Sequence, residues 1–208
     1  MIAVIVPIYN TEKYLRETID SVICQTLSFA EHIRLILLDD ASTDGSFAIC
    51  EQYQKQYPKQ ILVKHYDTNQ GVSVLRNEGV RIAGEMGDEL ITFLDSDDKL
   101  ADDAMEKAKM YFESHEDISV AAIAVKYFGT RDGEQRLNWR FQEMDVVDIK
   151  KQYTFPHYYV GGVFLRKRVL NELHFDETMN FWEDALAINQ VIVSEGKYGL
   201  IQDTFYFY

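Results

Sequence analysis

The chain has 208 residues, of which 47% are hydrophobic and 26% charged, and this balance predicts a globular protein with one sizeable core. Its formal net charge of −13 argues against a nucleic-acid partner held through its phosphates, because such a site needs a basic face. The N-terminal run MIAVIV is too short to span a membrane and has no basic flank or cleavage site, so we expect neither an anchor nor a signal peptide.

Residues 1–117 alternate short apolar runs with helical patterns. We expect strands at residues 2–6, 33–38, 61–66 and 90–94, and helices at 12–25, 46–57, 72–84 and 101–115. Strands without internal polar alternation, separated by helices, predict a parallel sheet that helices cover on both faces.

Residues 118–208 are less regular. We expect a strand at 118–128, a weaker strand at 138–147, a strand running into a helix over 158–173, an amphipathic helix at 181–195 and a final strand-like stretch ending in FYFY. We interpret this part as the mixed continuation of the same sheet. The whole chain is therefore predicted to form a single α/β domain.

The two cysteines, Cys24 and Cys50, lie among apolar residues in stretches with a helical pattern. This setting predicts buried thiols in a reducing compartment rather than a disulfide framework. We therefore expect a cytoplasmic protein.

Polar clusters follow each of the first four predicted strands. They are PIYN at residues 7–10, DDASTDGS at 39–46, DTNQG at 67–71 and DSDD at 95–98. In parallel sheets covered by helices, ligands bind at the carboxyl ends of the strands. Because all four clusters fall at that edge, we expect them to form one site.

The last of these clusters places Asp95, Asp97 and Asp98 within four residues. Ionised carboxylates repel one another, and burying one without a partner costs several kcal/mol. A solvated loop whose aspartates cap the next helix is the alternative. The convergence of four polar loops favours a bound cation instead.

Five motifs occur in a characteristic order: VPIYN, DDASTDGS, NQGVSVLRNEG, LDSDD and WEDALAIN. Together they resemble the ordered motifs of family 2 inverting glycosyltransferases, which have the Rossmann-like GT-A fold, and the resemblance covers nearly the whole chain. It implies a nucleotide-sugar donor and a glycan or lipid-linked glycan acceptor in the synthesis of bacterial cell-surface polysaccharide. It also implies a nucleotide-sugar-binding half at 1–117 and an acceptor-side half at 118–208.

The resemblance assigns roles to the acidic cluster. Asp95 is expected to contact the ribose or the donor sugar, while Asp97 and Asp98 face a divalent metal. Mg²⁺ or Mn²⁺ fits, because the cluster offers only oxygen donors, whereas zinc prefers His or Cys ligands. A cation between the carboxylates and the pyrophosphate makes both sets of negative charge tolerable.

The base of the nucleotide is expected to lie near Asp40. A carboxylate accepts a hydrogen bond from uracil N3–H, which cytosine lacks, so we prefer a UDP-sugar as donor, although guanine also has a ring N–H and leaves a GDP-sugar open. Pro7, Tyr9 and Asn10 are expected to wall the pocket, with Tyr9 giving the base an apolar surface. The alternatives are that Asp39 and Asp40 simply end a strand and that Tyr9 packs in the core.

Arg76 follows Gly71, a residue that permits close approach of the backbone to a ligand. Its guanidinium is expected to pair with Asp95 or Asp97 or with the donor phosphate, and a purely structural ion pair is the alternative.

Glu183 and Asp184 open the last predicted helix, where acidic residues also stabilise the helix dipole. The motif order assigns Asp184 as the general base that deprotonates the acceptor, with Glu183 orienting it.

The chain departs from the family pattern in several places. Ala41 stands where glycine is common, and Trp182 stands where a small residue is common and is expected to narrow the acceptor pocket. Relatives usually continue with C-terminal helices that hold the acceptor or touch the membrane, so we expect that region, and any peripheral membrane association through it, to be absent here. The Gln-x-x-Arg-Trp motif of processive synthases is not in this sequence, which favours single-sugar transfer, and its presence in the C-terminal region of a longer chain is the alternative. Among the histidines, His157 is a pocket-lining candidate.

Two other classes of function stay open. A sugar nucleotidyltransferase would need a glycine-rich loop with a basic residue after the first strand, and VPIYNTEKY contains no glycine. A catalytically inactive nucleotide-binding module would keep the pocket but would not hydrolyse a UDP-sugar when metal is present.

Overall fold

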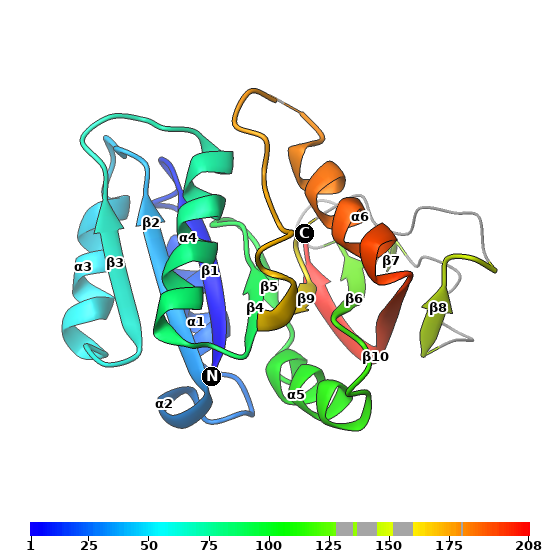
Figure 1. Cartoon of the computed structure of the whole chain (residues 1–208). Helices are drawn as coiled ribbons and strands as arrows, with labels where there is room; N and C mark the ends of the chain where they lie inside the picture. The colour runs from blue at the N-terminus through cyan, green and yellow to red at the C-terminus, as the bar shows by residue number, and fades with distance from the viewer. Residues whose placement is uncertain (128–134, 137–144, 152–159, 180) are drawn as a thin grey trace.

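The structure is a computed structural model that describes residues 1–127, 135–136, 145–151, 160–179 and 181–208 (Figure 1). The first part of the chain contains β1 (Ile2–Ile8), α1 (Leu15–Ile23), α2 (Phe29–His32), β2 (Ile33–Asp39), α3 (Ser46–Gln56), β3 (Ile61–His65), α4 (Val72–Met86) and β4 (Leu90–Phe93). The remainder contains β5 (Lys99–Leu100), α5 (Ala104–Ser114), β6 (Val120–Lys126), β7 (Gln135–Arg136), β8 (Val146–Asp148), β9 (Val163–Arg166), a 3-10 helix (Lys167–Val169), α6 (Glu183–Glu195) and β10 (Lys197–Phe207).

The described strands belong to one sheet. Its main path runs in the order β3-β2-β1-β4-β9-β6-β10-β5, with β7 beside β6 and β8 beside β10. The strands β3, β2, β1 and β4 are parallel, whereas β9 is antiparallel to both of its neighbours, β4 and β6. Strand β9 therefore joins the parallel part of the sheet to the mixed part.

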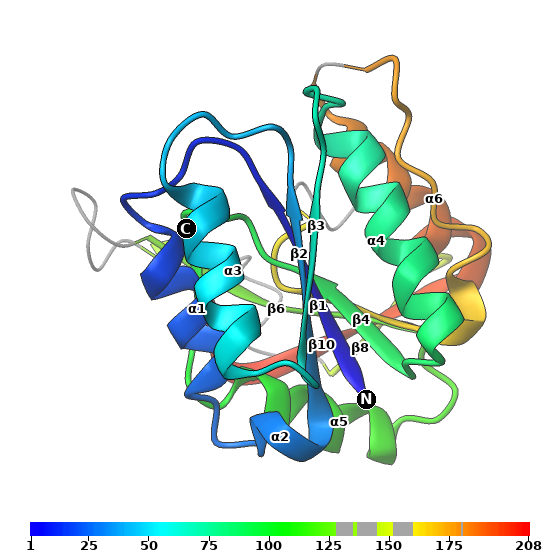
Figure 2. The ribbon, with the colours of Figure 1, turned by 90° about the vertical axis from the view of Figure 1, so that its left-hand side faces the viewer.

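Helices cover both faces of the sheet, and Figure 2 shows α1 and α3 on one side of the edge-on strands and α4 and α6 on the other. Every residue of β1 is buried, which explains why this strand has no polar alternation. Helices α1, α3 and α5 contribute to one apolar cluster and α4 and α6 to a second. Among the helices of the described ranges, none has the length and apolar character needed to cross a bilayer.

The fold confirms the predicted α/β class, the parallel first half and the mixed continuation of the same sheet. The four strands expected in the first half correspond to β1 to β4, and the helices expected at 46–57 and 72–84 correspond to α3 and α4. The helix expected at 181–195 corresponds to α6.

Two predicted helices begin too early. Helix α1 begins at Leu15 rather than at residue 12, because the Thr11 carbonyl accepts the N–H groups of Tyr14 and Leu15 in a preceding turn. Helix α5 begins at Ala104 rather than at residue 101, because Ala101, which follows β5, donates its N–H to the Phe205 carbonyl of β10 instead of entering the helix.

Two expectations for the second half need correction. The helix expected to follow the strand in 158–173 is only the short 3-10 helix Lys167–Val169, which follows β9 directly. Of the strand expected at 138–147, only Val146 and Val147 lie in a described strand, β8, while 137–144 lie outside the described residues.

The prediction of two buried, free thiols is confirmed for Cys50 and wrong on the burial of Cys24. Both thiols are free, but only Cys50 is buried, whereas Cys24 is exposed. Cys24 is the C-cap residue that follows α1, so it lies beyond the apolar face of the helix that the sequence pattern marks.

Candidate active site

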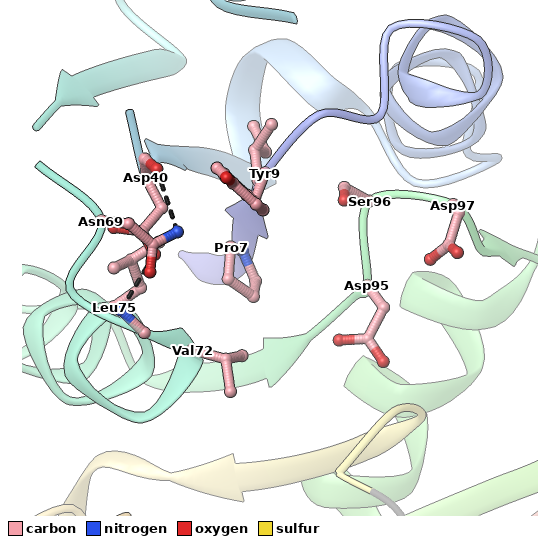
Figure 3. Close-up of a pocket in the computed structure, with 11 residues that line it drawn as sticks. Pro7, Tyr9, Asp40, Asn69, Val72, Leu75, Asp95, Ser96 and Asp97 are labelled. Carbon is pink, nitrogen blue, oxygen red and sulfur yellow. Dashed lines mark hydrogen bonds between the residues drawn. The ribbon is translucent and has the colours of Figure 1, made fainter. Parts of the chain in front are cut away.

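One open pocket of about 440 Å³ lies at the carboxyl ends of the parallel strands (Figure 3). Its lining comes from the end of β1, the segments after β1, β2, β3 and β4, and the start of α4, in agreement with the predicted convergence of the four polar clusters. The lining residues are Pro7, Ile8, Tyr9, Asp40, Asn69, Gly71, Val72, Leu75, Asp95, Ser96 and Asp97. Figure 3 shows Asp40 and Asn69 on one side, Asp95 and Asp97 on the other, and Pro7 and Tyr9 between them. The pocket thus has one end formed by Asp40 and Asn69 and an acidic end formed by Asp95 and Asp97.

Asp40 is buried at the first of these ends, where its carboxylate organises the loop after β3. Its Oδ1 accepts the Gln70 N–H at 2.6 Å and its Oδ2 accepts the Gly71 N–H at 2.9 Å. Each carboxylate oxygen has a second lone pair, so these contacts leave acceptor capacity toward the pocket. The neighbouring Asp39 points away from the pocket, and its Oδ2 lies 2.7 Å from Nδ1 of His65.

Tyr9 is half exposed in the pocket, which rules out the alternative that it packs in the core. Asn10, by contrast, is not among the lining residues. Its Oδ1 accepts the Thr43 N–H at 2.8 Å and its own N–H donates to Ser42 Oγ at 3.0 Å. Asn10 therefore fastens the β1 loop to the β2 loop, and its expected contact with the nucleotide stays a prediction.

The three aspartates at the acidic end differ in direction. Asp95 and Asp97 line the pocket, whereas Asp98 is 5% exposed and its Oδ2 accepts the Tyr206 hydroxyl at 2.5 Å. Desolvation raises the pKa of Asp98 to about 7, with the Tyr206 hydrogen bond lowering it and the two neighbouring carboxylates raising it. Desolvation, and then the charge of Asp95, raise the pKa of Asp97.

Arg76 connects this acidic end to the start of α6. It is 5% exposed, and its guanidinium donates to Asp95 Oδ1 at 3.1 Å and to Glu183 Oε1 at 2.9 Å. The guanidinium also lies over the ring of Phe175, 5.6 Å from its centroid. The expected pair with Asp95 is confirmed, and Glu183 is a partner that the sequence did not indicate.

Asp184 is half-buried at the N-terminal end of α6. Its Oδ1 accepts the Ala185 N–H at 2.7 Å and its Oδ2 accepts the Val160 N–H at 3.3 Å. Desolvation raises the pKa of Asp184 and the charge of Glu183 adds to the rise, while the two N–H groups and Arg76 oppose it. The net rise makes this carboxylate a better proton acceptor than an ordinary one.

The residue before this pair has an unusual backbone. Trp182, the residue at which α6 is capped, has φ of 67°, which favours glycine, and its side chain is 64% exposed. Ala41, the other departure from the family pattern, has φ of 60°. A positive φ at both positions explains why glycine would suit them.

The carboxylates at the acidic end suit a divalent cation in part. Within the described ranges, no group of three or more His, Cys, Asp or Glu side chains is arranged to hold a metal. Mg²⁺ and its relatives usually take one or two protein carboxylates and complete their shell with substrate phosphates and water. Asp95 and Asp97, two carboxylates at one pocket wall, fit that kind of site.

Sequence reasoning missed several residues of this site. Asn69 and Ser96 line the pocket without having been singled out, although both lie inside the polar clusters that marked the strand ends. Tyr206 and Val160 contact site residues from distant parts of the chain, and no local pattern marks them. His157 lies outside the described residues.

Comparison with known proteins agrees with this geometry. The profile of the family described as "Glycosyl transferase family 2" matches residues 3–174. The minor teichoic acid biosynthesis protein GgaA of Bacillus subtilis is 40% identical over 210 residues, a match that covers 100% of this chain and 47% of GgaA. The chain therefore spans about half the length of this relative.

Solved structures show the same fold. S. aureus TarS 1-349 in complex with UDP-GlcNAc has a TM-score of 0.81 and 24% identity, covering 100% of this chain and 58% of that one. The mannosyltransferase PcManGT from Pyrobaculum calidifontis, in complex with GDP-Man and Mn²⁺, has a TM-score of 0.72 and 17% identity, covering 100% and 56%. The fold is thus GT-A, and with the match to the family profile the comparison places the chain in glycosyltransferase family 2.

Proposed function

We propose that the chain is the catalytic domain of an inverting glycosyltransferase that moves a sugar from a UDP-sugar to a hydroxyl of a teichoic-acid-type or related cell-surface glycan. The observation that carries the proposal is the pocket itself, with Asp40 at one end and Asp95 and Asp97 at the other, joined through Arg76 to the pair Glu183 and Asp184. The name of GgaA and the UDP-GlcNAc complex of TarS support the acceptor and donor classes.

The donor would lie across the pocket from its base end to its acidic end. Uracil would occupy the space beside Tyr9 and Asp40, where the free acceptor capacity of the carboxylate suits N3–H. The diphosphate would reach the wall formed by Asp95 and Asp97. Because that wall is negative, we propose that Mg²⁺ or Mn²⁺ is held there by Asp97 with Asp95, as the Mn²⁺ complex of PcManGT supports.

Such a cation would offset the charge of the departing diphosphate. The remaining chemistry belongs to the chain. Asp184 would take the proton of the acceptor hydroxyl while the hydroxyl oxygen bonds to the anomeric carbon. The bond from that carbon to the UDP oxygen would break on the opposite face of the sugar. Glu183, paired with Arg76, would hold the start of α6 rather than react. Attack from the opposite face inverts the anomeric configuration.

A ligand panel tests the donor class. Thermal shifts would be measured with UDP, GDP, CDP and dTDP, each with and without Mn²⁺. We expect a larger shift with UDP plus Mn²⁺ than with CDP plus Mn²⁺ or with UDP alone, because uracil has the ring N–H that Asp40 can bind, cytosine lacks it, and the diphosphate needs a cation. A larger shift with CDP would overturn the uracil assignment, and the absence of any shift with Mn²⁺ would overturn the donor site.

A transfer assay separates an enzyme from an inactive binding module. The chain would be incubated with UDP-GlcNAc, UDP-glucose and UDP-GalNAc, Mn²⁺ and purified teichoic acid, and UDP release would be measured. We expect release with at least one donor, and release that depends on Asp184. A protein that binds UDP but releases none from any donor, even slowly to water, would be the inactive module.

A further inference from the structure

The hydroxyl of Tyr206 contacts both ends of the acidic loop formed by residues 95–98. Tyr206 lies in β10 and is 2% exposed. Its hydroxyl donates to Asp98 Oδ2 at 2.5 Å and accepts the Asp95 N–H at 3.2 Å. A single buried oxygen thus uses a donor and an acceptor site to tie together two residues that lie three apart in the chain.

The same loop has anchors on two other elements. The Thr18 hydroxyl of α1 donates to the Ser96 carbonyl at 2.9 Å, in a buried contact. Arg76 of α4 pairs with Asp95. Asp98 turns inward to Tyr206, whereas Asp97 is exposed and lines the pocket. The loop is therefore held from the inside by three elements while it presents Asp97 to the pocket.

The ring of Tyr206 packs against the segment that contacts Asp184. A Cβ added at Gly161 would lie 2.4 Å from Cζ of Tyr206, and one added at Gly162 would lie 3.0 Å from its Cβ, so only glycine lets this backbone approach the ring. Gly161 also forms a parallel bridge with Phe93, which ends β4. The residue before it, Val160, donates its N–H to Asp184.

We propose that Tyr206 is the positioning residue of this site, fixing the loop 95–98 and the segment 160–162 against each other. In this arrangement Asp98 is the buried acceptor of the Tyr206 hydroxyl rather than a metal ligand. A buried carboxylate such as that of Asp98 needs a hydrogen-bond donor, and the Tyr206 hydroxyl supplies one. The consequence for catalysis rests on the proposed function, but the positioning itself does not.

The first test measures the loop directly, in the full chain without ligand. In Tyr206→Phe the ring still packs on Gly161, but the Asp95 N–H and Asp98 lose their partner. We expect hydrogen exchange of the loop 95–98 amides to become at least about tenfold faster. The matched control is Tyr111→Phe, which also removes a buried phenol hydrogen bond, to the Asp145 carbonyl at 2.6 Å, but away from the loop. Unchanged exchange in Tyr206→Phe, or an equal change in Tyr111→Phe, would overturn the proposal.

The second test separates an anchor from a metal ligand and serves if Tyr206→Phe does not fold. UDP binding would be measured by calorimetry with MnCl₂ for Asp98→Asn and Asp97→Asn. The amide oxygen that Asp98→Asn introduces can still accept the phenol proton, so we expect less than about a fivefold loss for this variant and a loss of about a hundredfold for Asp97→Asn. Equal large losses would make Asp98 a ligand and overturn its role as anchor. If the wild type binds no UDP, the donor proposal fails, and the exchange experiment still decides the role of Tyr206.

Discussion

The proposed donor side of the site and the proposed general-base side are built in different ways. On the proposed donor side, Pro7 lies near the end of β1, and Tyr9, Asp40, Asp95 and Asp97 lie in the segments that follow β1, β2 and β4. On the base side, Asp184 opens a helix, and its neighbours reach it across long stretches of chain: Arg76 pairs with Glu183 over 107 residues, and Val160 contacts Asp184 over 24. Parallel strands thus bring together polar residues that are local in sequence, whereas the proposed general base depends on contacts between segments that lie far apart in the chain.

If this division is right, variants of the two sides should fail in different measurements. Donor-side variants should lose UDP affinity, and base-side variants should lose turnover. Variants that lose both together would show that the two sides act as one unit, coupled through Arg76.

The largest effect is expected for Asp184→Asn. A positioned general base is typically worth about 10²–10⁴-fold, so turnover should fall by about that factor while UDP affinity stays nearly unchanged. Turnover would be measured as UDP release at saturating donor and acceptor, and affinity by calorimetry. More than about a tenth of wild-type turnover would exclude Asp184 as the base. Retention of the anomeric configuration, by NMR of the product, would exclude the inverting mechanism.

The next effect concerns the metal and the acidic wall of the pocket. A like-charge pair at about 4 Å costs about 1 kcal/mol in bulk water and about 4 kcal/mol at an effective dielectric near 20, and a pocket open to solvent lies between these limits. EDTA, or Asp97→Asn in the presence of Mn²⁺, should therefore weaken UDP by about a hundredfold. Glu113→Gln, which changes an exposed carboxylate on α5, is the control and should bind as wild type does. Equal UDP binding with and without EDTA would contradict the metal proposal.

Asp40→Asn should weaken UDP by about tenfold. The amide keeps one acceptor oxygen but places an N–H₂ group where a carboxylate oxygen accepts the N–H of Gln70 or Gly71. The substitution therefore weakens the hydrogen bond to uracil by removing the charge, and it disturbs the loop after β3. Asp39→Asn is the matched control, because Asp39 contacts His65 and does not line the pocket. Equal losses of UDP affinity in the two variants would show that Asp40 does not bind the uracil.

The pH dependence of turnover and that of UDP affinity should reflect different carboxylates. Asp184 accepts a proton only when ionised, and its raised pKa means that it becomes protonated at a higher pH than an ordinary aspartate. Turnover at saturating donor and Mn²⁺ should therefore fall as the pH drops through that pKa, by about tenfold per pH unit below it. Asp97, whose pKa is also raised, should show its titration in UDP affinity instead. A turnover that stays flat down to about pH 4, the ordinary value for Asp, would contradict the base assignment.

The sequence predicted the lining of the pocket well because its information is local. Apolar runs that end in polar clusters mark β1 to β4, and the parallel arrangement then brings Tyr9, Asp40 and Asp97 to one pocket. The direction of Asp98 could not be predicted in the same way, because it is set by Tyr206, 108 residues later. The early start predicted for α5 has a similar cause, since the Ala101 N–H bonds to the Phe205 carbonyl of β10, a partner that no local pattern reveals. Local patterns thus reveal which segments carry chemistry, while partners across the sheet decide where each side chain points.

The smallest effect tests the backbone of the donor side. Ala41 has φ of 60°, a conformation that costs an L-residue about 1–2 kcal/mol, whereas glycine adopts it freely but loses about 0.5–1 kcal/mol through the greater entropy of its unfolded state. Ala41→Gly should therefore raise the free energy of unfolding by about 0.5 kcal/mol, measured by urea denaturation. The matched control is Ala48→Gly at an exposed position inside α3, where the same replacement should lower it by about 1 kcal/mol. Opposite signs are expected because only Ala41 has a positive φ. If both variants are destabilised equally, the left-handed backbone at Ala41 carries no strain, and the common glycine at this position in relatives needs another explanation, such as close approach of the nucleotide.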